Sequence, residues 1–376
     1  MLKKTLGAAL AVLLLLALYL AWWPVPVKAV AWVAPQAPGY AGPHAVNQRL
    51  AGLQHIALNG EEGPEHVVLA RDGWLYAAMA SGRILRMRPD GSGQQVFVDT
   101  GGRPLGFDFD AQGRMLIADG MKGLLMATPD GQLKVLATQV SAGDPIVYAD
   151  AVVVAPDGRV YLSDASTRFS PARWGGTFEA SVLDILEQSA TGRVLVFNPA
   201  DGQVQVVAHG LSFANGVALS QDGQWLFVNE TGQYRVWKVA TAARGLDVRP
   251  FVAQGGPQAR VLLDNLPGYP DNLMRGLDGR LWLGLAKPRN AVIDGFAAKP
   301  GLRELTLRLP RALWPIPPAY GHVIAFNEAG QVLADLQDPS GAYPETTAIT
   351  ETPERLYVQS LHAKTLGWLP RSALPR

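Results

Sequence analysis

A short hairpin pattern recurs along most of this chain, and it constrains the fold more than any other feature of the sequence. Each copy consists of an apolar run, an Asp-Gly turn or its equivalent, and a second apolar run. Asp-Gly between two such runs is a strong β-hairpin signal, because the turn needs a positive φ that glycine adopts at least cost. The six turn residues are Gly73, Gly113, Gly158, Gly223, Gly279 and, in a degenerate copy, Glu354.

The spacing of these turns indicates a β-propeller. They are separated by about 40 to 75 residues, near or above the length of one propeller blade. A second hairpin follows several turns, as at Asp90-Gly91, so each unit can supply a four-stranded blade. Two stacked β-sandwiches are the alternative, but they do not require the same turn six times at one register. The sequence therefore predicts an all-β fold, a six-bladed β-propeller, over residues 48–376.

Two of the longer spacings contain insertions. They span Phe169–Ala190 and Pro288–Tyr320, and the second is rich in proline and leucine. We expect both to form loops or short helices on one face of the propeller.

The N-terminus predicts one transmembrane helix. Two lysines at positions 3 and 4 precede an uncharged apolar run over residues 6–20, and two tryptophans follow. The run approaches the ~20 residues that cross a bilayer, and the lysines favour a cytoplasmic N-terminus. A signal peptide cleaved near Ala31 is the alternative. We expect residues 1–24 to form a membrane anchor and residues 25–47 a linker, with the propeller outside the cytoplasm, in a periplasmic, lumenal or extracellular space.

Composition excludes several classes of function. The 376 residues carry a net charge of +1 and include no cysteine. Without a basic stripe, nucleic acid is not an expected partner. Without cysteine, disulfides, thiolate metal sites and a cysteine nucleophile are excluded. Serine-hydrolase and nucleotide-binding motifs are also missing from the sequence. A metal site in this chain would therefore use oxygen and imidazole ligands.

One position of the repeat is polar in most units. It lies seven residues before each turn Asp or its equivalent, where the first strand of the unit begins. The residues at this position are Glu65, Leu105, Asp150, Asn215, Asp271 and Thr346. The first strand of every propeller blade lines the central channel, so equivalent positions form a ring.

The composition of this ring predicts a metal site. The three carboxylates repel one another when no cation is bound. Together with the amide they suit a hard ion with six to eight oxygen ligands, such as Ca²⁺, better than Zn²⁺. Asp and Asn are also common at strand starts as turn residues. Their recurrence at one register nevertheless favours a calcium site, to which Asn272 could add a further oxygen.

Four motifs occur in order along the predicted propeller. They are Gly63-Pro64-Glu65, Gly102-Arg103-Pro104-Leu105-Gly106, Leu211-Ser212-Phe213-Ala214-Asn215-Gly216-Val217 and Asn265-Leu266-Pro267-Gly268-Tyr269-Pro270-Asp271-Asn272. Together they resemble the strictosidine synthase-like family, in particular its membrane-anchored, adipocyte plasma membrane-associated type. The resemblance covers residues 48–369.

The resemblance implies a type of chemistry. The wider group includes gluconolactonases and paraoxonases, which use a channel metal to polarise an ester or lactone carbonyl. Its four protein ligands correspond to Glu65, Asp150, Asn215 and Asp271 of this chain. By analogy with the gluconolactonase branch, Asp271 would also activate water.

Two departures from the family pattern limit this inference. Asp150-Ala151 stands where relatives usually have Asn-Asp, which keeps the ligand but loses a neighbouring acid. Thr346-Thr347-Ala348 lacks the glutamate that strictosidine synthases need for Pictet–Spengler condensation. The expected function is therefore Ca²⁺-dependent hydrolysis of a small ester or lactone. The alternative is a non-catalytic, membrane-anchored binding or scaffold propeller with a structural calcium.

Overall fold

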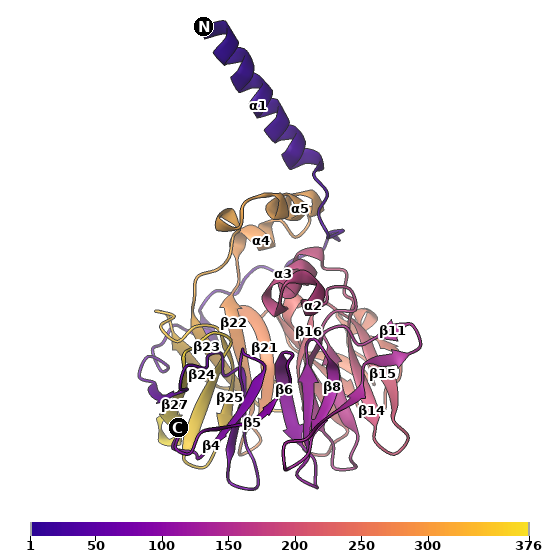
Figure 1. Ribbon diagram of the computed structural model, residues 1–376, viewed down its shortest axis with the longest axis vertical. Coiled ribbons are helices and arrows are strands. Elements are labelled where there is room, and N and C mark those ends of the chain that lie inside the picture. Colours follow the sequence, from indigo (N-terminus) through magenta and orange to yellow (C-terminus); the bar gives the residue numbers. More distant parts are fainter. Residues whose placement is uncertain (1, 375–376) are drawn as a thin grey trace.

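The computed structural model describes residues 2–374, and the predicted propeller is confirmed as six blades standing side by side (Figure 1). The first strand of each blade is the innermost. Blade 1 contains β2 (His66–Leu69), β3 (Leu75–Ala78), β4 (Arg83–Met87) and β5 (Gln95–Asp99). Blade 2 contains β6 (Pro104–Phe109), β7 (Met115–Asp119), β8 (Gly123–Ala127) and β9 (Leu133–Ala137). Blade 3 contains β12 (Ala149–Val154), β13 (Val160–Asp164), β14 (Gly192–Asn198) and β15 (Gln203–Leu211), with β19 (Leu246–Asp247) added in parallel at its edge.

The remaining blades follow the same order. Blade 4 contains β16 (Ala214–Leu219), β17 (Trp225–Glu230), β18 (Arg235–Ala240) and β20 (Ala259–Leu263). Blade 5 contains β21 (Gly268–Arg275), β22 (Leu281–Pro288), β23 (Gly321–Phe326) and β24 (Val332–Asp338). Blade 6 contains β25 (Thr346–Glu351), β26 (Arg355–Ser360), β27 (Thr365–Pro370) and β1 (Gln54–Ala57). A small hairpin of β10 (Gln139–Ser141) and β11 (Asp144–Pro145) connects blades 2 and 3.

Blade 6 closes the propeller with strands from both ends of the domain. Strand β1 pairs antiparallel with β27, so that Gln54 lies opposite Trp368. The hairpin turns have the predicted backbone: the φ angles of the five turn glycines lie between 68° and 86°. The second strands that follow these turns are buried, as in β3 and β7, because neighbouring blades cover both of their faces.

Both predicted insertions are helical and lie on the same face (Figure 1). The first contains α2 (Pro171–Trp174) and α3 (Thr177–Glu187), and the second contains α4 (Ala291–Gly295), α5 (Pro300–Arg308) and the 3₁₀ helix η4 (Arg311–Leu313). We call residues 169–190 and 288–320 the canopy. The other 3₁₀ helices are η1 (Gly42–His44), η2 (Thr231–Gln233), η3 (Arg249–Phe251) and η5 (Arg371–Ala373).

Helix α1 (Leu2–Trp22) projects from the canopy side of the molecule (Figure 1). Its residues 3–22 have a mean hydropathy of 2.2 and none is buried against the propeller, so α1 is long and apolar enough to cross a membrane. Its C-terminal end contacts α5.

Residues 25–47, predicted as a linker, lie against the propeller, and we call them the strap. Val27 is buried in a cluster with canopy residues. The backbone of Val30 donates to Glu187 at 2.8 Å, and that of Trp32 donates to Ala297 at 3.1 Å. The strap thus connects α1 to blade 6 through a series of fixed contacts.

Glu351 joins blade 5, blade 6 and the C-terminal segment. Its carboxylate accepts hydrogen bonds from Arg280 at 2.7 Å and Arg371 at 2.8 Å. The indole of Trp282 donates to it at 2.9 Å. Burial alone would raise the pKa of Glu351, but these donors lower it to about 2.

We expect Glu351→Gln to lower the free energy of unfolding at pH 7 by about 2 kcal/mol. Since the folded pKa lies below the ordinary value of 4.5, this stabilisation is present above about pH 4.5 and is lost as the pH falls toward 2. The difference in melting temperature between the variant and the parent should therefore narrow below pH 4.5. Thermal unfolding of the detergent-solubilised protein between pH 7 and pH 3 measures it, and a constant difference would contradict the assignment.

The matched control for this experiment is Glu328→Gln. Glu328 also pairs with an arginine, Arg275, at 2.6 Å, but both side chains are about one-third exposed. Solvent screens such a pair, so this substitution should change stability by less than about 1 kcal/mol at any pH in the series.

Candidate metal centre and substrate pocket

β-Bulges at the start of the inner strands position the predicted ring residues. The pairing of β12 with β13 shifts between Ala149 and Val152, and equivalent shifts occur in β16, β21 and β25. Asp150, Asn215 and Asp271 lie inside these shifts. A bulge frees one residue from the ladder and redirects its side chain, which explains why a polar residue is tolerated at the start of a buried strand.

The ring residues are buried and act on one another electrostatically. Burial and the negative charges of Asp271 and Glu65 raise the pKa of Asp150 well above its ordinary value. Burial and the charge of Glu65 likewise raise the pKa of Asp271. The structure therefore brings the three acidic side chains near enough to disfavour one another's ionised form.

Two of the predicted ligands, Asn215 and Asp271, are hydrogen-bonded to each other. Asn215 Nδ2 donates to Asp271 Oδ1 at 3.2 Å, and the amide oxygen of Asn215 is buried without a hydrogen-bond partner. The amide oxygen of Asn272, the predicted additional ligand, also lacks a partner. Buried oxygens without donors are costly unless a cation or a water fills the space, so both residues suit a hard-cation site.

Arg103 is a channel residue that the sequence reasoning did not identify. Its guanidinium forms an ion pair with Glu65, and both side chains are buried. Three carboxylates and one guanidinium leave two negative charges in the channel, which one divalent cation would neutralise. The sequence held one signal for Arg103: it lies two residues before Leu105, the repeat position of blade 2.

The three ring carboxylates do not form a compact cluster. Among residues 2–374, the oxygens of Glu65, Asp150 and Asp271 do not form a group that lies entirely within 4.8 Å. Glu65 is held toward Arg103 instead. Thr346, the ring residue of blade 6, supplies no acid to the channel. Its hydroxyl accepts a hydrogen bond from the backbone N–H of His322 and donates one to the carbonyl oxygen of His322.

Side chains of blades 4, 5 and 6 hold the ligand-bearing backbone. Asn229 hydrogen-bonds the carbonyl oxygen of Asp271, and Thr231 donates to that of Pro270 at 2.6 Å. Asn272 and Thr347 donate to the carbonyl oxygen of Glu65 at 2.9 Å and 2.7 Å. These contacts connect the start of blade 1 to blades 5 and 6, and they fix the bulges from which the ligands project.

A pocket of about 170 Å³ lies between the canopy and the channel. Phe178, Ile185 and Trp314 of the canopy contribute apolar walls, and Asn215 and Asp271 line the other end. An apolar enclosure with a few convergent polar groups is typical of small-molecule sites.

Lys287 and Glu345 complete the polar end of this pocket. They pair at 2.7 Å, and His362 donates a second hydrogen bond to Glu345. Burial alone would raise the pKa of Glu345, but the bonds from His362 and Lys287 lower it. Neither Lys287 nor His362 stands at a repeat position, so the pattern of the sequence could not assign them.

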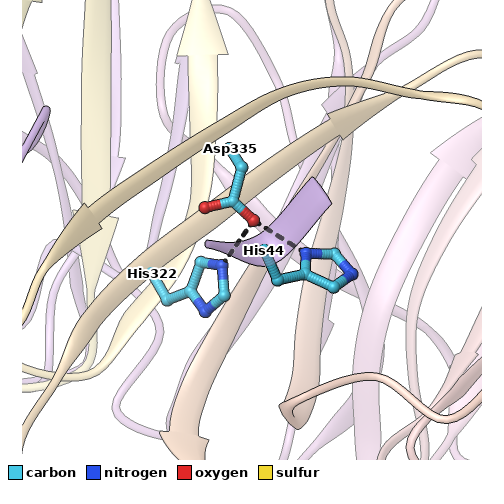
Figure 2. A group of neighbouring side chains, drawn as sticks. All are labelled: His44, His322 and Asp335. Carbon is cyan, nitrogen blue, oxygen red and sulfur yellow. Dashed lines mark hydrogen bonds and ion pairs between the residues drawn. The ribbon is translucent and has the colours of Figure 1, made fainter. Parts of the chain in front are cut away.

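A second cluster lies where the strap meets blade 5 (Figure 2). The imidazole nitrogens His44 Nδ1 and His322 Nε2 each lie 2.8 Å from Asp335 Oδ2. The three ligand atoms lie within 4.8 Å of one another, a spacing that a transition metal could also accept. Asp335 additionally accepts hydrogen bonds from Gln337 and Asn47. Since the carboxylate is already satisfied, we interpret the cluster as a clasp that holds the strap.

Comparison with known proteins agrees with this architecture. The model of the SMP-30/gluconolactonase/LRE-like region matches residues 67–324, and the model of the strictosidine synthase-like N-terminal region matches residues 42–87. Strictosidine synthase-like 6 of Arabidopsis thaliana is 30% identical over 82% of this chain and 77% of its own length. The adipocyte plasma membrane-associated protein of Salmo salar is 28% identical over 90% of this chain and 82% of its own length.

Solved structures share the fold. A gluconolactonase of Xanthomonas campestris has a TM-score of 0.59 at 20% identity, covering 94% of this chain and 98% of its own. Regucalcin of Agrobacterium tumefaciens, a calcium-binding protein, has a TM-score of 0.56 at 15% identity, covering 84% of this chain and 93% of its own. The family match spans more than half of the chain, and the two curated relatives cover 82% and 90% of it. The chain therefore belongs to the SMP-30/gluconolactonase/LRE-like family, among its strictosidine synthase-like members.

Proposed function

We propose that this protein hydrolyses esters or lactones with the help of a Ca²⁺ ion held by Glu65, Asp150, Asn215 and Asp271, and that α1 anchors it to a membrane. One observation carries the proposal: the apolar pocket under the canopy ends at Asn215 and Asp271. A substrate in that pocket would place its polar group against the same side chains that would hold the ion.

The chain's own residues have separate roles in this proposal. When bound, the cation would polarise the carbonyl and stabilise the charge that develops on its oxygen. Asp271 would accept a proton from water, and Asn215, which donates to Asp271 Oδ1, would orient that carboxylate. The canopy would exclude bulk water, which strengthens electrostatic interactions inside the pocket.

Two comparisons support the proposal. Two solved structures that share the fold are a gluconolactonase and a calcium-binding protein, regucalcin. The charge of the channel also fits a divalent ion, as argued above from Arg103 and the three carboxylates.

The decisive experiment measures turnover of phenyl acetate and a panel of simple lactones by the full-length protein in detergent. We expect hydrolysis that a chelator abolishes and that added Ca²⁺ restores, together with a melting temperature that rises with Ca²⁺. No hydrolysis across the panel at saturating Ca²⁺, combined with a Ca²⁺-dependent melting temperature, would favour the scaffold with a structural ion instead. A melting temperature that a chelator leaves unchanged would contradict the bound ion itself.

A further inference from the structure

The connection between α1 and the propeller is too short to let the canopy leave the membrane surface. Trp22 and Trp23 stand at the end of α1 and are exposed, as expected for residues at a bilayer interface. Only four residue steps later, Val27 is buried among canopy side chains. An extended chain covers at most about 3.5 Å per residue, so these steps span no more than about 14 Å.

Direct contacts shorten this distance further. Arg308, the last residue of α5, donates from Nε to the backbone oxygen of Trp23 at 2.7 Å. Figure 1 shows α4 and α5 between α1 and the blades. If α1 spans the bilayer, these helices lie at the lipid headgroups, because the polar interfacial layer begins where the apolar helix ends.

The canopy exposes apolar side chains to solvent. Val292 of α4 is 47% exposed, Leu313 of η4 is 63% exposed and Ile316 is 46% exposed. The exposed cations Lys299 and Arg311 lie in the same segment. Apolar side chains beside cations are characteristic of surfaces that rest in the interface of a bilayer.

The rim of the substrate pocket belongs to this surface. Phe178 and Ile316 are exposed, and both also line the pocket. The same pocket continues to Asn215 and Asp271. Its mouth therefore opens among the apolar side chains that the short connection holds against the membrane.

We propose that the canopy lies in the membrane interface and that the pocket takes its substrate from the bilayer. The occupant of this surface is lipid, and the substrate class is an ester or lactone with a hydrocarbon chain that partitions into the membrane. The inference about the substrate rests on the proposed hydrolase function, whereas the inference that the canopy lies in the membrane interface does not.

The absence of cysteine from the chain allows a direct test. Leu313→Cys and Ile316→Cys are labelled with an environment-sensitive fluorophore in the full-length protein, reconstituted in vesicles of phosphatidylcholine with one-fifth phosphatidylglycerol. The control is Ala111→Cys, an exposed site in the turn after β6, at the end opposite the ring residue Leu105. Spin-labelled lipids should quench the canopy labels about threefold or more relative to the control. Equal quenching at all three sites, or a protein that does not remain with the vesicles, would overturn the inference that the canopy lies in the membrane interface.

A second measurement tests whether the substrate enters the pocket from the bilayer. The double variant Val292→Glu and Leu313→Glu changes two exposed canopy residues that do not line the pocket. It should raise KM for a twelve-carbon δ-lactone in the same vesicles about tenfold, because charged side chains are expelled from the interface. Its KM for water-soluble phenyl acetate should not change. Equal effects on both substrates would overturn bilayer delivery. If neither substrate is hydrolysed by the parent protein, the hydrolase proposal fails. The quenching result still shows whether the canopy lies in the membrane interface.

Discussion

Replacing Gly216 with alanine is expected to destabilise the propeller by about 3 kcal/mol or more, because no space for a methyl group exists where blades 4 and 5 meet. A Cβ atom at this position would lie 2.4 Å from the backbone nitrogen of Leu273 and 2.6 Å from the carbonyl oxygen of Asp271. Both obstacles are backbone atoms, so no change of rotamer relieves the clash. The inner strands β16 and β21 must separate instead.

The same separation should weaken the metal site. Asn215 directly precedes Gly216, and the clash falls on the backbone of Asp271, so two of the proposed ligands move apart. We expect the melting temperature and the Ca²⁺ affinity of Gly216→Ala to fall together, measured by thermal unfolding and calorimetric titration of the full-length protein in detergent. The control is Gly52→Ala, where a Cβ atom meets nothing within 4 Å and the change should stay within about 0.5 kcal/mol. Parent-like stability of Gly216→Ala would contradict the blade packing.

The fold could be predicted from the sequence wherever its determinants are local. The hairpin turns depend on two or three adjacent residues, and the glycines at 73, 113, 158, 223 and 279 have the positive φ angles that the pattern requires. A fixed register between turn and inner strand then identifies equivalent positions, as at Asp150 and Asp271. Closed symmetry converts those equivalent positions into neighbours in space, which no single hairpin could indicate.

Features that depend on residues distant in the chain were not predictable in this way. Strand β1 pairs with β27 across more than 300 residues, and neither segment has a sequence pattern that identifies the other as its partner. The strap looked like a linker because it is rich in proline and lacks periodicity, yet Val27 and His44 fix it to the canopy and to blade 5. Such contacts follow from the shape of the assembled propeller.

In the candidate site, too, local features could be predicted and long-range contacts could not. Polar residues at the repeat position could be identified, but the bulges that redirect them could not, because a bulge is a mismatch between two strands. Arg103 was missed because the repeat position of blade 2 is Leu105, and the residue that reaches Glu65 lies two positions earlier. The insertions were recognised by length and predicted to form loops or short helices. The bounds of those helices and the residues that line the pocket under them depend on packing against the strap and could not be predicted.

Exchanging Asp271 for asparagine is expected to lower kcat for a lactone substrate by about 100-fold or more at saturating Ca²⁺, because the proposed proton acceptor is removed. The amide keeps an oxygen of the same size at the position that faces Asn215, so much of the ion affinity should remain. Asp271→Ala removes both the ligand and the base. It should therefore lose activity together with most of the rise in melting temperature that Ca²⁺ produces in the parent.

Comparing these two variants separates binding from catalysis. Asp164→Asn is the matched control. Asp164 is also a buried aspartate, but it lies in blade 3, where it pairs with Arg193 at 2.9 Å. It should lower stability, as the loss of a buried ion pair does, and leave the Ca²⁺ dependence of both activity and melting temperature intact. If Asp271→Asn binds Ca²⁺ as the parent does and keeps kcat within about threefold, Asp271 is a ligand only, because a general base contributes at least about a hundredfold. The proton would then have to leave through another group at the polar end of the pocket, and Glu345 is the other carboxylate in the lining.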